Sequence, residues 1–417
     1  MSTTLTSTFA SLGLSAGMLR DIAKAGFLET TPIQAQAIPA ALEGRDVLGC
    51  AQTGTGKTAA FLIPMIERLA DAAKGPPRGL VLAPTRELAL QIQAVVDQLG
   101  RSRQVFATTI IGGADMQAQV RALGQQPDIL VATPGRLLDH MWNGTIHMTS
   151  LQIVVLDEAD RMLDMGFAPQ INQVLDALPE QRQTLLFSAT VPTDLADLAR
   201  VSMKDPVRTM VAKPATPAAG VTHMLHHTTP GEKTPLLLSL VKDHGDSVLV
   251  FTRTKHRADR LGETLGRVGH RVAVLHGDRR LSQRRRALEG FRRGQFRILV
   301  ATDIAARGLD IANIGHVINY DLPNSPEDYV HRIGRTARMK AVGRATSFVT
   351  AEDHGQIRAI ERLLGRSVPR APGSPAPSRP QSGRESAWPE PHAGHRTQRP
   401  EHFSEVRARR RPGGSRP

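Results

Sequence analysis

Cysteine is nearly absent from this chain: Cys50 is the only one in 417 residues. A single cysteine excludes an intramolecular disulfide and a zinc site built from cysteines, so a plain buried role is expected for Cys50. Long apolar runs are also missing, because no stretch approaches the roughly 20 apolar residues that span a bilayer. Residues 1–10 lack the charged-then-apolar pattern of a secretory signal. We therefore expect a cytoplasmic protein with no membrane partner.

Acidic residues are outnumbered by basic ones. There are 53 Lys and Arg against 39 Asp and Glu, which gives a formal net charge of +14 and an isoelectric point near 10.8. Such a charge favours a polyanionic partner, although composition alone does not separate nucleic acid from an anionic membrane. Hydrophobic residues make up 40% of the chain, as is ordinary for folded proteins. The length suits two domains of roughly 100 to 200 residues each, plus a tail.

Short apolar runs that end in small polar or acidic residues recur along the chain, with segments of helical periodicity between them. This pattern is typical of parallel strands buried on both faces. Five runs lie in the first half (46–50, 79–83, 129–133, 153–157 and 184–188) and five in the second (247–252, 271–276, 297–302, 316–320 and 345–349). The sequence therefore predicts an α/β fold with two doubly wound parallel-sheet units. The similarity of residues 130–134 to 299–303 hints at a duplication, although so short a match also arises by chance.

Composition divides the chain into five segments. Pro206, Pro214, Pro217 and Gly220 interrupt the apolar periodicity, as expected of an exposed linker. The last 52 residues are rich in Pro, Gly, Ser and Arg, and bury too little apolar surface to offset their ordering entropy. We expect an N-terminal flanking segment (1–40), a first domain (41–207), a linker (208–220), a second domain (221–365) and a disordered basic tail (366–417).

The first chemical motif is the loop Ala51-Gln-Thr-Gly-Thr-Gly-Lys-Thr58, which follows an apolar run and precedes a helical segment. In such a loop, backbone N–H groups and the positive end of the helix dipole face phosphate oxygens. Lys57 would reach the outer phosphates, and the Thr58 hydroxyl would ligate Mg²⁺. Ala51 replaces the first glycine of the usual pattern, and a Gly/Thr-rich turn is the alternative. The expected nucleotide contacts are Ala51, Gln52, Thr53, Gly54, Thr55, Gly56, Lys57 and Thr58.

The second motif is acidic. Residues 153–156 form an apolar run that leads directly into Asp157-Glu158-Ala159-Asp160. Carboxylates are thereby placed at the carboxyl end of a strand, where open α/β sheets bind ligands. We expect Asp157 to bind Mg²⁺ and Glu158 to orient or deprotonate the attacking water. A solvated acidic helix start is the alternative, but it does not explain the phosphate loop upstream.

Three motifs together carry a resemblance to a known family. Asp157-Glu-Ala-Asp160, Ser188-Ala-Thr190 and His331-Arg-Ile-Gly-Arg-Thr-Ala-Arg338 resemble those of the DEAD-box RNA helicases, and the resemblance extends over residues 9–364. The chain looks most similar to the bacterial RhlE-like branch. The resemblance implies two tandem RecA-like domains, ATP and Mg²⁺ as cofactors, and RNA as partner, either single-stranded or as a short duplex.

The resemblance also implies contacts to the base and sugar of ATP. Phe27 and Gln34 match the adenine-reading motif of the family, with Thr30 where the family usually has Pro. A planar amide donates and accepts at once, so Gln34 can select adenine over guanine. Asp310 matches the family's ribose contact.

Further residues match positions that act on the outer phosphate or link the ATP site to domain closure. Arg335 and Arg338 match the arginine fingers, which reach the γ-phosphate from the second domain, and Ala337 replaces the usual Gly between them. A guanidinium supplied by another domain makes hydrolysis depend on closure. Ser188, Thr190 and His331 match coupling positions.

The RNA contacts are likewise implied by the resemblance. Arginines would hold phosphates while glycines let backbone N–H groups approach closely, so that little base sequence is read. The matching positions are Arg86, Gly112, Gly113 and Arg136 in the first domain, and Arg253, Gln283, Arg286 and Thr302 in the second. The tail, with eleven arginines against four glutamates, would tether RNA without reading its sequence.

Three functions remain open at this point. The leading one is an RNA-stimulated ATPase that clamps RNA and locally opens a short duplex, acting on targets such as ribosomal precursors or together with RNA-decay proteins. The second is an ATP-gated RNA clamp or assembly scaffold with little net unwinding. The third is a DNA-translocating helicase, which shares the phosphate loop and arginine fingers. Only contacts to the 2′-hydroxyl separate RNA from DNA, and a sequence does not display them.

Overall fold

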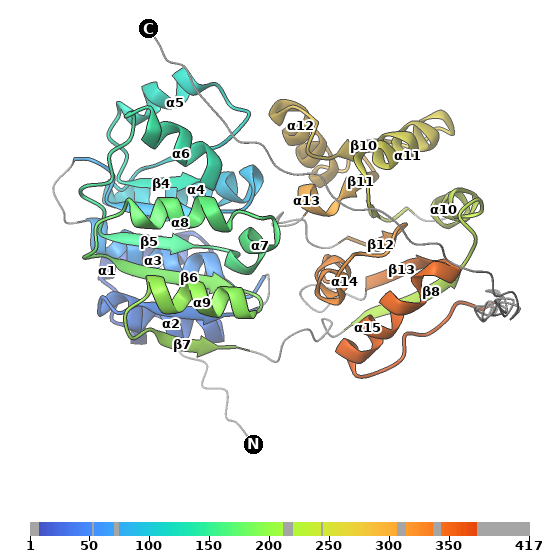
Figure 1. Cartoon of the computed structure of the whole chain (residues 1–417), viewed down its shortest axis with the longest axis horizontal. Helices are drawn as coiled ribbons and strands as arrows, with labels where there is room; N and C mark the ends of the chain where they lie inside the picture. The colour runs from blue at the N-terminus through green and yellow to red at the C-terminus, as the bar shows by residue number, and fades with distance from the viewer. Residues whose placement is uncertain are drawn as a thin grey trace, which may run out of the picture. The chain divides into compact units, whose positions relative to one another are not determined.

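The computed structural model describes residues 8–51, 54–70, 75–211, 220–242, 245–306, 314–336 and 343–372. These residues form two all-parallel sheets with helices between the strands (Figure 1). The two α/β domains predicted from the apolar runs are therefore confirmed. No helix in this described part of the chain is both long and apolar enough to cross a bilayer.

The first domain holds a seven-stranded sheet in the order β3-β4-β2-β5-β6-β1-β7. Its strands are β1 (Val47–Cys50), β2 (Gly79–Leu82), β3 (Ala107–Ile110), β4 (Ile129–Ala132), β5 (Ile153–Leu156), β6 (Gln183–Ser188) and β7 (Val207–Met210). Its α-helices are α1 (Ala16–Lys24), α2 (Pro32–Leu42), α3 (Lys57–Ala70), α4 (Arg86–Gly100), α5 (Met116–Leu123), α6 (Pro134–Trp142), α7 (Ala159–Asp164), α8 (Ala168–Asp176) and α9 (Thr193–Ser202).

The second domain holds a six-stranded sheet in the order β10-β11-β9-β12-β13-β8. Its strands are β8 (Val221–His227), β9 (Val248–Thr252), β10 (Val272–Leu275), β11 (Ile298–Thr302), β12 (His316–Asn319) and β13 (Gly343–Val349). Its α-helices are α10 (Lys233–Lys242), α11 (Lys255–Arg267), α12 (Leu281–Arg292), α13 (Asp303–Ala306), α14 (Pro326–Ile333) and α15 (His354–Leu364).

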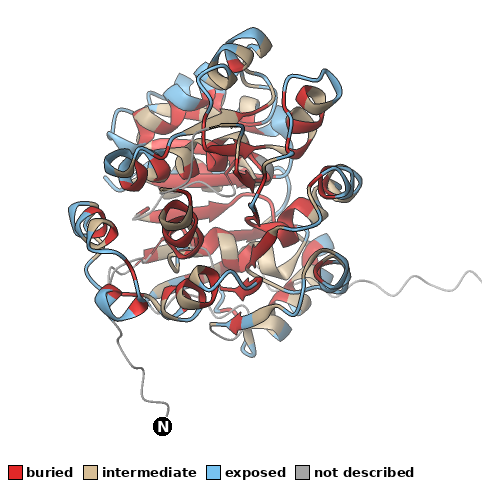
Figure 2. Ribbon diagram, turned by 90° about the vertical axis from the view of Figure 1, so that its left-hand side faces the viewer, coloured by how far each residue is buried: buried red, intermediate tan, exposed pale blue. Residues whose placement is uncertain are grey.

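The central strands β2, β5, β9 and β12 are buried at every position because helices cover both faces of each sheet. Along β2, Val81 packs into one hydrophobic cluster while Leu80 and Leu82 pack into the cluster on the opposite face. The second sheet repeats the pattern, with Phe251 on one side and Val250 on the other. Figure 2 shows the buried strands between helices whose outer sides are exposed. This two-sided burial is what makes the runs continuous rather than alternating.

Both sheets follow one strand order when each is numbered from its own first strand. The order is third, fourth, second, fifth, sixth, first, and the first domain adds β7 beyond its first strand. The similar segments 130–134 and 299–303 begin within β4 and β11, which hold the same place in the two sheets. The topology therefore supports a duplicated unit.

Three expected boundaries differ from the structure. Residues 208–210 belong to β7, which pairs with β1, so they are not linker. Phe9, Met18 and Ile33 lie in the hydrophobic core of the first domain, so the flanking segment is part of that domain. Residues 366–372 are not tail: Val368 is 3% exposed, and the Leu225 N–H donates to the Pro369 carbonyl at 2.8 Å. Each boundary prediction was wrong because a few apolar residues in a mainly polar segment are enough to pack that segment against the neighbouring domain.

Candidate active site

The phosphate-binding loop connects β1 to α3 at the carboxyl edge of the first sheet. Gly54 and Gly56 have φ angles of 86° and 88°, which a residue with a side chain rarely adopts. Lys57 is the first residue of α3, is buried, and donates its Nζ hydrogen to the Ala51 carbonyl. The Ala51 N–H donates to the Ser188 carbonyl at 2.9 Å, and the φ of Ala51 is not positive, so alanine fits where the usual pattern has glycine. Gln52 and Thr53 lie outside the described residues.

Gln34 joins α2 to this loop. It is 2% exposed, and its amide nitrogen donates to the Gly56 carbonyl at 3.1 Å. Its amide oxygen accepts from the Thr31 backbone at 2.9 Å and so caps α2. A Cβ atom on Gly56 would lie 2.4 Å from the Gln34 nitrogen, so any larger residue at position 56 would clash with the Gln34 side chain. Phe27 lies 6.5 Å from Phe9 between ring centroids.

The acidic motif follows β5. Asp157 is 2% exposed, and burial, together with the neighbouring Glu158, raises the pKa of its carboxyl to about 7. Burial also pushes the pKa of Glu158 upward, but the charges of Arg161 and Lys57 outweigh it and leave that pKa below its usual value. The pKa values of two adjacent acids are thus shifted in opposite directions, because only Glu158 has a close guanidinium.

The Glu158 carboxylate is held in place by its own helix. Its Oε2 accepts from Arg161 Nη1 at 2.7 Å, and both side chains are largely buried. The backbone of Glu158 has a φ of 50°, in the left-handed region that non-glycine residues rarely occupy. Such a conformation persists only where surrounding contacts fix it, and it is common at functional sites.

Asp160 connects the acidic motif to the Ser188–Thr190 segment after β6. Its Oδ2 accepts from the Thr190 hydroxyl and the Thr190 N–H, both at 2.9 Å, and from the Ala189 N–H at 3.2 Å. The Ser188 hydroxyl donates to the Thr190 carbonyl. These bonds join the Thr190 loop to the residue two positions from Glu158. The resemblance predicts a coupling role for Ser188 and Thr190, but it did not identify Asp160 as their hydrogen-bond partner.

A pocket of about 590 Å³ combines residues from both domains. Lys57 and Glu158 line it together with His331 of α14 and with Arg335, which follows α14. Burial and the nearby Arg335 lower the pKa of His331 to about 4, so its ring is neutral at pH 7. The structure therefore brings four of the predicted residues together. Arg338 and Asp310 lie outside the described residues.

The predicted RNA contacts of the first domain converge on one loop. Gly113 has a φ of 74°, and a Cβ atom there would lie 2.3 Å from Arg86 Nη1. Arg136 donates from Nη1 to the Ala114 carbonyl at 3.0 Å. Two arginines from separate motifs thus lie against residues 112–114, where the absence of a side chain on Gly113 lets the Arg86 guanidinium approach the backbone.

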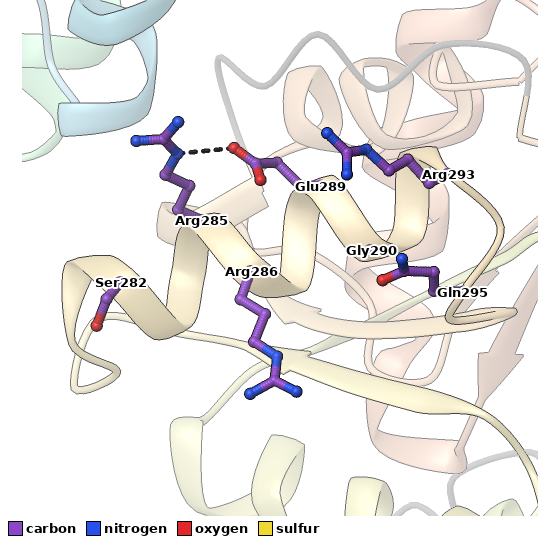
Figure 3. A pocket seen from close by; sticks show the side chains of 7 residues that line it. All are labelled: Ser282, Arg285, Arg286, Glu289, Gly290, Arg293 and Gln295. Carbon is purple, nitrogen blue, oxygen red and sulfur yellow. Dashed lines mark hydrogen bonds and ion pairs between the residues drawn. The ribbon is translucent and has the colours of Figure 1, made fainter.

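In the second domain the predicted contacts come from neighbouring strand ends and one helix. Thr302 ends β11 beside Thr252 of β9, and Arg253 follows directly. Arg286 is exposed on α12 and projects to the side opposite Arg285, which pairs with Glu289 at 2.7 Å (Figure 3). The exposed surface of α12 is cationic and shallow, with an adjoining hollow of about 290 Å³.

Two parallel-sheet domains, with a phosphate loop before α3 and an acid pair after β5, define an ATP-hydrolysing protein of the two-domain RecA-like class. Comparison with known proteins narrows the class. The DEAD/DEAH box helicase family matches residues 31–198, and the helicase conserved C-terminal domain matches residues 232–340. The DEAD-box ATP-dependent RNA helicase CshA of Bacillus cereus is 43% identical over 364 residues, covering 87% of this chain and 69% of the relative.

A fungal relative and a solved structure indicate the same family. The ATP-dependent rRNA helicase RRP3 of Meyerozyma guilliermondii is 44% identical over 370 residues, covering 88% of this chain and 78% of the relative. The structure of Saccharomyces cerevisiae Dbp5 bound to RNA and ADP BeF3 matches with a TM-score of 0.79 at 32% identity, covering 87% of this chain and 95% of that one. The chain belongs to the DEAD-box ATP-dependent RNA helicases. Its likeness to the RhlE-like branch stays a prediction.

Proposed function

We propose that this helicase uses ATP binding to clamp RNA and open a short duplex locally, and that hydrolysis releases the strand. The supporting observation is the pocket that Lys57 and Glu158 share with His331 and Arg335. A guanidinium contributed by the second domain stabilises the charge that develops on the transferred phosphoryl group. Hydrolysis then requires both domains, so its rate reports on their closure.

The ATP site would be built almost entirely from the first domain. Phe27 and Gln34 hold the base, residues 51–58 hold the phosphates, and Asp310 and Arg338 complete the site from the second domain. Mg²⁺ fits beside the buried Asp157, since a cation there would stabilise the ionised carboxylate whose pKa is otherwise raised. In the described part of the chain no group of three or more His, Cys, Asp or Glu could hold a metal ion, in keeping with an ion shared with nucleotide phosphates. Thr58 would supply the second protein ligand.

Glu158 would act on the attacking water. Its carboxylate stays ionised beside Arg161 and can accept the water's proton as the oxygen attacks the γ-phosphorus. Asp160 bonds to Thr190, so we propose that Ser188 and Thr190 pass the state of the nucleotide to the domain interface. His331, neutral at pH 7, would take part through its ring nitrogens rather than as a cation.

RNA would bind along the carboxyl edges of both sheets. We propose phosphate contacts by Arg86, Arg136, Arg253 and Arg286, with Gly113 and Thr302 making closer contacts to the backbone. Contacts of this kind carry little base information, which favours broad sequence tolerance. Because the relative RRP3 is described as an rRNA helicase, ribosomal precursor RNA is a reasonable first target to test. A cytoplasmic location remains a prediction.

The decisive experiment compares ATP hydrolysis without nucleic acid, with single-stranded RNA and with single-stranded DNA, alongside separation of a short RNA duplex. We expect strong stimulation by RNA, weak stimulation by DNA, and duplex opening that requires ATP. Equal stimulation by DNA would favour a DNA-translocating helicase. Slow turnover with slow RNA release and no strand separation would favour a clamp or scaffold.

A further inference from the structure

The shared strand order gives each strand of the first sheet a counterpart in the second, with β8 corresponding to β1 and β12 to β5. The helix after β1 begins at Lys57 and the helix after β8 begins at Lys233, and each lysine is followed by a threonine. The strand β5 is followed by Asp157, and β12 is followed by Tyr320 and Asp321. The second domain therefore has a lysine and a carboxylate at the positions that serve the nucleotide in the first.

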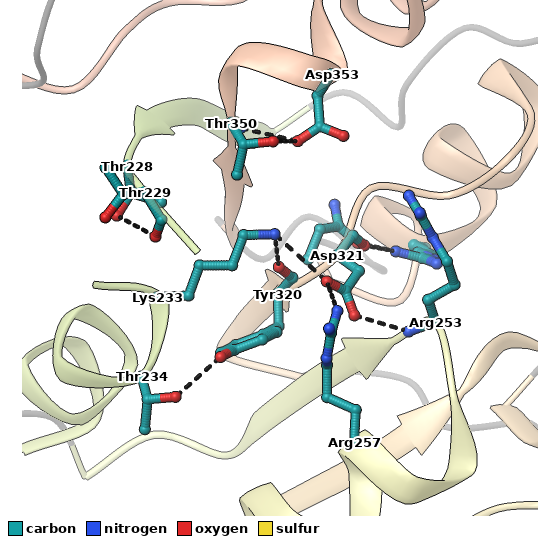
Figure 4. Close-up of polar contacts among 12 residues, drawn as sticks. Thr228, Thr229, Lys233, Thr234, Arg253, Arg257, Tyr320, Asp321, Thr350 and Asp353 are labelled. Carbon is teal, nitrogen blue, oxygen red and sulfur yellow. Dashed lines mark hydrogen bonds and ion pairs between the residues drawn. The ribbon is translucent and has the colours of Figure 1, made fainter. Parts of the chain in front are cut away.

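In the second domain this lysine and carboxylate are bonded to each other (Figure 4). Lys233 Nζ donates to one Asp321 carboxylate oxygen at 3.3 Å and to the Tyr320 carbonyl at 3.0 Å. The same carboxylate oxygen accepts from Arg257 Nη1 at 2.6 Å, and the other accepts from the Arg253 backbone N–H at 3.0 Å. Lys233 and Asp321 are 7% and 3% exposed. Two cations and a backbone donor thus surround one buried carboxylate, as such groups surround a bound phosphate.

The charge on Asp321 is secured by these neighbours. Burial alone would raise the pKa of its carboxyl, but the hydrogen bonds from Arg257 and Arg253 and the charge of Lys233 outweigh burial and keep that pKa below its usual value. In the first domain the matching Lys57 donates to the Ala51 carbonyl. The lysine and the aspartate are therefore bonded to each other in the second domain, whereas in the first domain the lysine is bonded to a backbone carbonyl.

We propose that Asp321 is a built-in anion that occupies the second domain's counterpart of the ATP phosphate site, and that it positions Arg253 for RNA. Its carboxylate fixes the backbone at the carboxyl end of β9, from which the Arg253 side chain leaves. The inference rests on the proposed RNA contact of Arg253. It makes Asp321 a positioning residue, because its carboxylate would act on RNA through the Arg253 backbone.

The same loop is also fixed from α14. The Asp321 carbonyl accepts from Arg332 Nη1 at 2.6 Å, and Arg332 pairs through two bonds of 2.6 Å with Asp303, the residue after Thr302. Arg332 is 3% exposed and follows His331 directly. One buried network thus joins the strand ends proposed to hold RNA to the helix proposed to act on ATP.

A cavity of about 580 Å³ lies over this network. Arg253, Arg257 and Arg260 line it, but so do Glu352 and Asp353. With Asp321, the three carboxylates of the lining offset all but one of its four positive charges, so little net attraction for a second anion remains. An anionic ligand in this cavity is therefore the competing outcome that the experiment must separate.

The first test measures RNA-stimulated ATP hydrolysis by the full chain carrying Asp321→Asn, which keeps the shape and removes the charge. We expect the RNA concentration for half-maximal activity to rise on the order of fivefold to tenfold, since a charge-assisted contact to the Arg253 backbone is weakened. The maximal rate and the KM for ATP should change little. A merely structural role would instead lower the maximal rate together with the melting temperature, and that result would overturn the proposal.

Two arginines of α11 supply a matched pair of variants that tests the same contacts without changing Asp321. Arg257→Gln removes a bond to Asp321 and should raise the RNA requirement in the same direction. Arg267, 74% exposed and paired with Glu263, lies on the same helix away from Asp321, so Arg267→Gln should leave the RNA requirement unchanged. Equal effects of the two substitutions would contradict a specific role for the Asp321 contacts.

The second test asks whether Asp321 blocks an anion site. In a Lys57→Ala background, which weakens the first site, pyrophosphate should not raise the melting temperature, whereas adding Asp321→Asn should create a measurable rise. Stabilisation by pyrophosphate before Asp321 is changed would show an open anion site and refute the built-in anion. Arg253→Ala separates the proposed RNA contact of Arg253 from the proposed role of Asp321. An unchanged RNA requirement in Arg253→Ala would refute the RNA contact, and the pyrophosphate experiment would still test whether Asp321 blocks an anion site.

Discussion

Glu158 combines burial, an ion pair with Arg161 at 2.7 Å and a left-handed backbone with a φ of 50°. Each feature costs free energy or conformational freedom unless its neighbours support it. Their coincidence at one acid is what a site residue with a fixed orientation requires. The acidic motif predicted the residue, but the pairing with Arg161, three positions along, was not predicted because an i,i+3 pair on a helix is usually an exposed surface feature.

Glu158→Gln should bind ATP and RNA with near-normal affinity yet hydrolyse ATP about 100-fold or more slowly. The amide keeps the shape of the side chain but cannot accept the proton of the attacking water. Equilibrium binding and single-turnover hydrolysis check this. Lys57→Ala is the contrasting variant, because its ammonium contacts ground-state phosphates and its loss should weaken ATP binding itself. Turnover near the native rate in Glu158→Gln would remove Glu158 from the mechanism.

Gln34→Ala should raise the KM for ATP and reduce the preference for ATP over GTP by about tenfold. The amide both reads adenine in our proposal and donates to the Gly56 carbonyl, so its loss leaves polar groups unpaired at a cost of about 1 to 3 kcal/mol. Steady-state kinetics with both nucleotides measure the ratio. A rise in KM that is equal for ATP and GTP would mean that Gln34 shapes the phosphate loop without reading the base.

His331 gives a pH dependence with a definite sign. Its pKa is lowered to about 4 in the folded chain, against a usual value near 6.5, so the folded state disfavours its protonation. The stability that depends on the neutral ring is present above about pH 6.5 and is lost as the pH falls towards 4. Between pH 7 and 5 we expect unfolding to become easier by about 2 kcal/mol more in the native chain than in His331→Gln. Identical pH profiles of the two melting temperatures would refute this.

At the scale of elements, the sequence predicted ten strands, and the structure places a strand at each of these runs. Most of these predictions held because the strands are buried on both faces, whereas β10 is a half-buried edge strand that was found because all four of its residues are apolar. Three strands were missed. Ala107–Ile110 is only partly buried, Val207–Met210 is an edge strand with exposed positions, and Val221–His227 contains three histidines. Edge and half-buried strands carry a weaker apolar pattern, so their existence follows from pairing with neighbours rather than from local composition.

The site was predicted unevenly for the same reason. Motifs such as residues 51–58 are contiguous in the chain, so they could be predicted from the sequence. Contacts such as Asp160 with Thr190, and Asp321 with Lys233, join residues 30 and 88 positions apart. No local pattern encodes such pairs, since they depend on which strand ends are neighbours in the sheet. The resemblance supplied the family's motif positions, but not the side chains that hold them.

The segment that follows α14 should act as a unit with the first domain's phosphate site. Arg335→Ala should leave ATP binding intact and abolish most of the stimulation by RNA, a loss of about 1000-fold or more if it is the arginine finger. The measurement is the ATPase rate at saturating ATP with and without RNA. Arg267→Gln, an exposed arginine of α11, is the control for loss of one positive charge. Full stimulation in Arg335→Ala would refute the finger role.

At the scale of the whole molecule, the boundary between folded domain and tail decides how truncations behave. Val368 and Ala371 are buried, and residues 369–371 bond to Leu225 of β8. A chain ending at residue 365 should therefore lose stability in the second domain. A chain ending at residue 372 should melt like the native protein.

Removal of residues 373–417 should weaken RNA binding in a salt-dependent way. That segment holds nine arginines and four glutamates, a net charge of +5. If about four arginines engage phosphates, the slope of log affinity against log salt should become shallower by about 3, at roughly 0.7 per contact to single-stranded RNA. The maximal ATPase rate should stay the same, because the proposed site residues lie upstream. Equal slopes of log affinity against log salt with and without the segment would refute RNA tethering and indicate that the segment serves solubility only.

The strand order also determines when each strand can pair with its neighbours during translation. β1 lies between β6 and β7, so the first strand made must wait for the last two of its sheet. At roughly 5 to 20 residues per second, Met210 is added about 10 to 30 seconds after Val47. During that interval both edges of an apolar strand are unpaired and prone to associate with other chains. β8 likewise waits for β13, but its three histidines make its unpaired edges less apolar, so the first sheet should be the one whose synthesis depends more on chaperones.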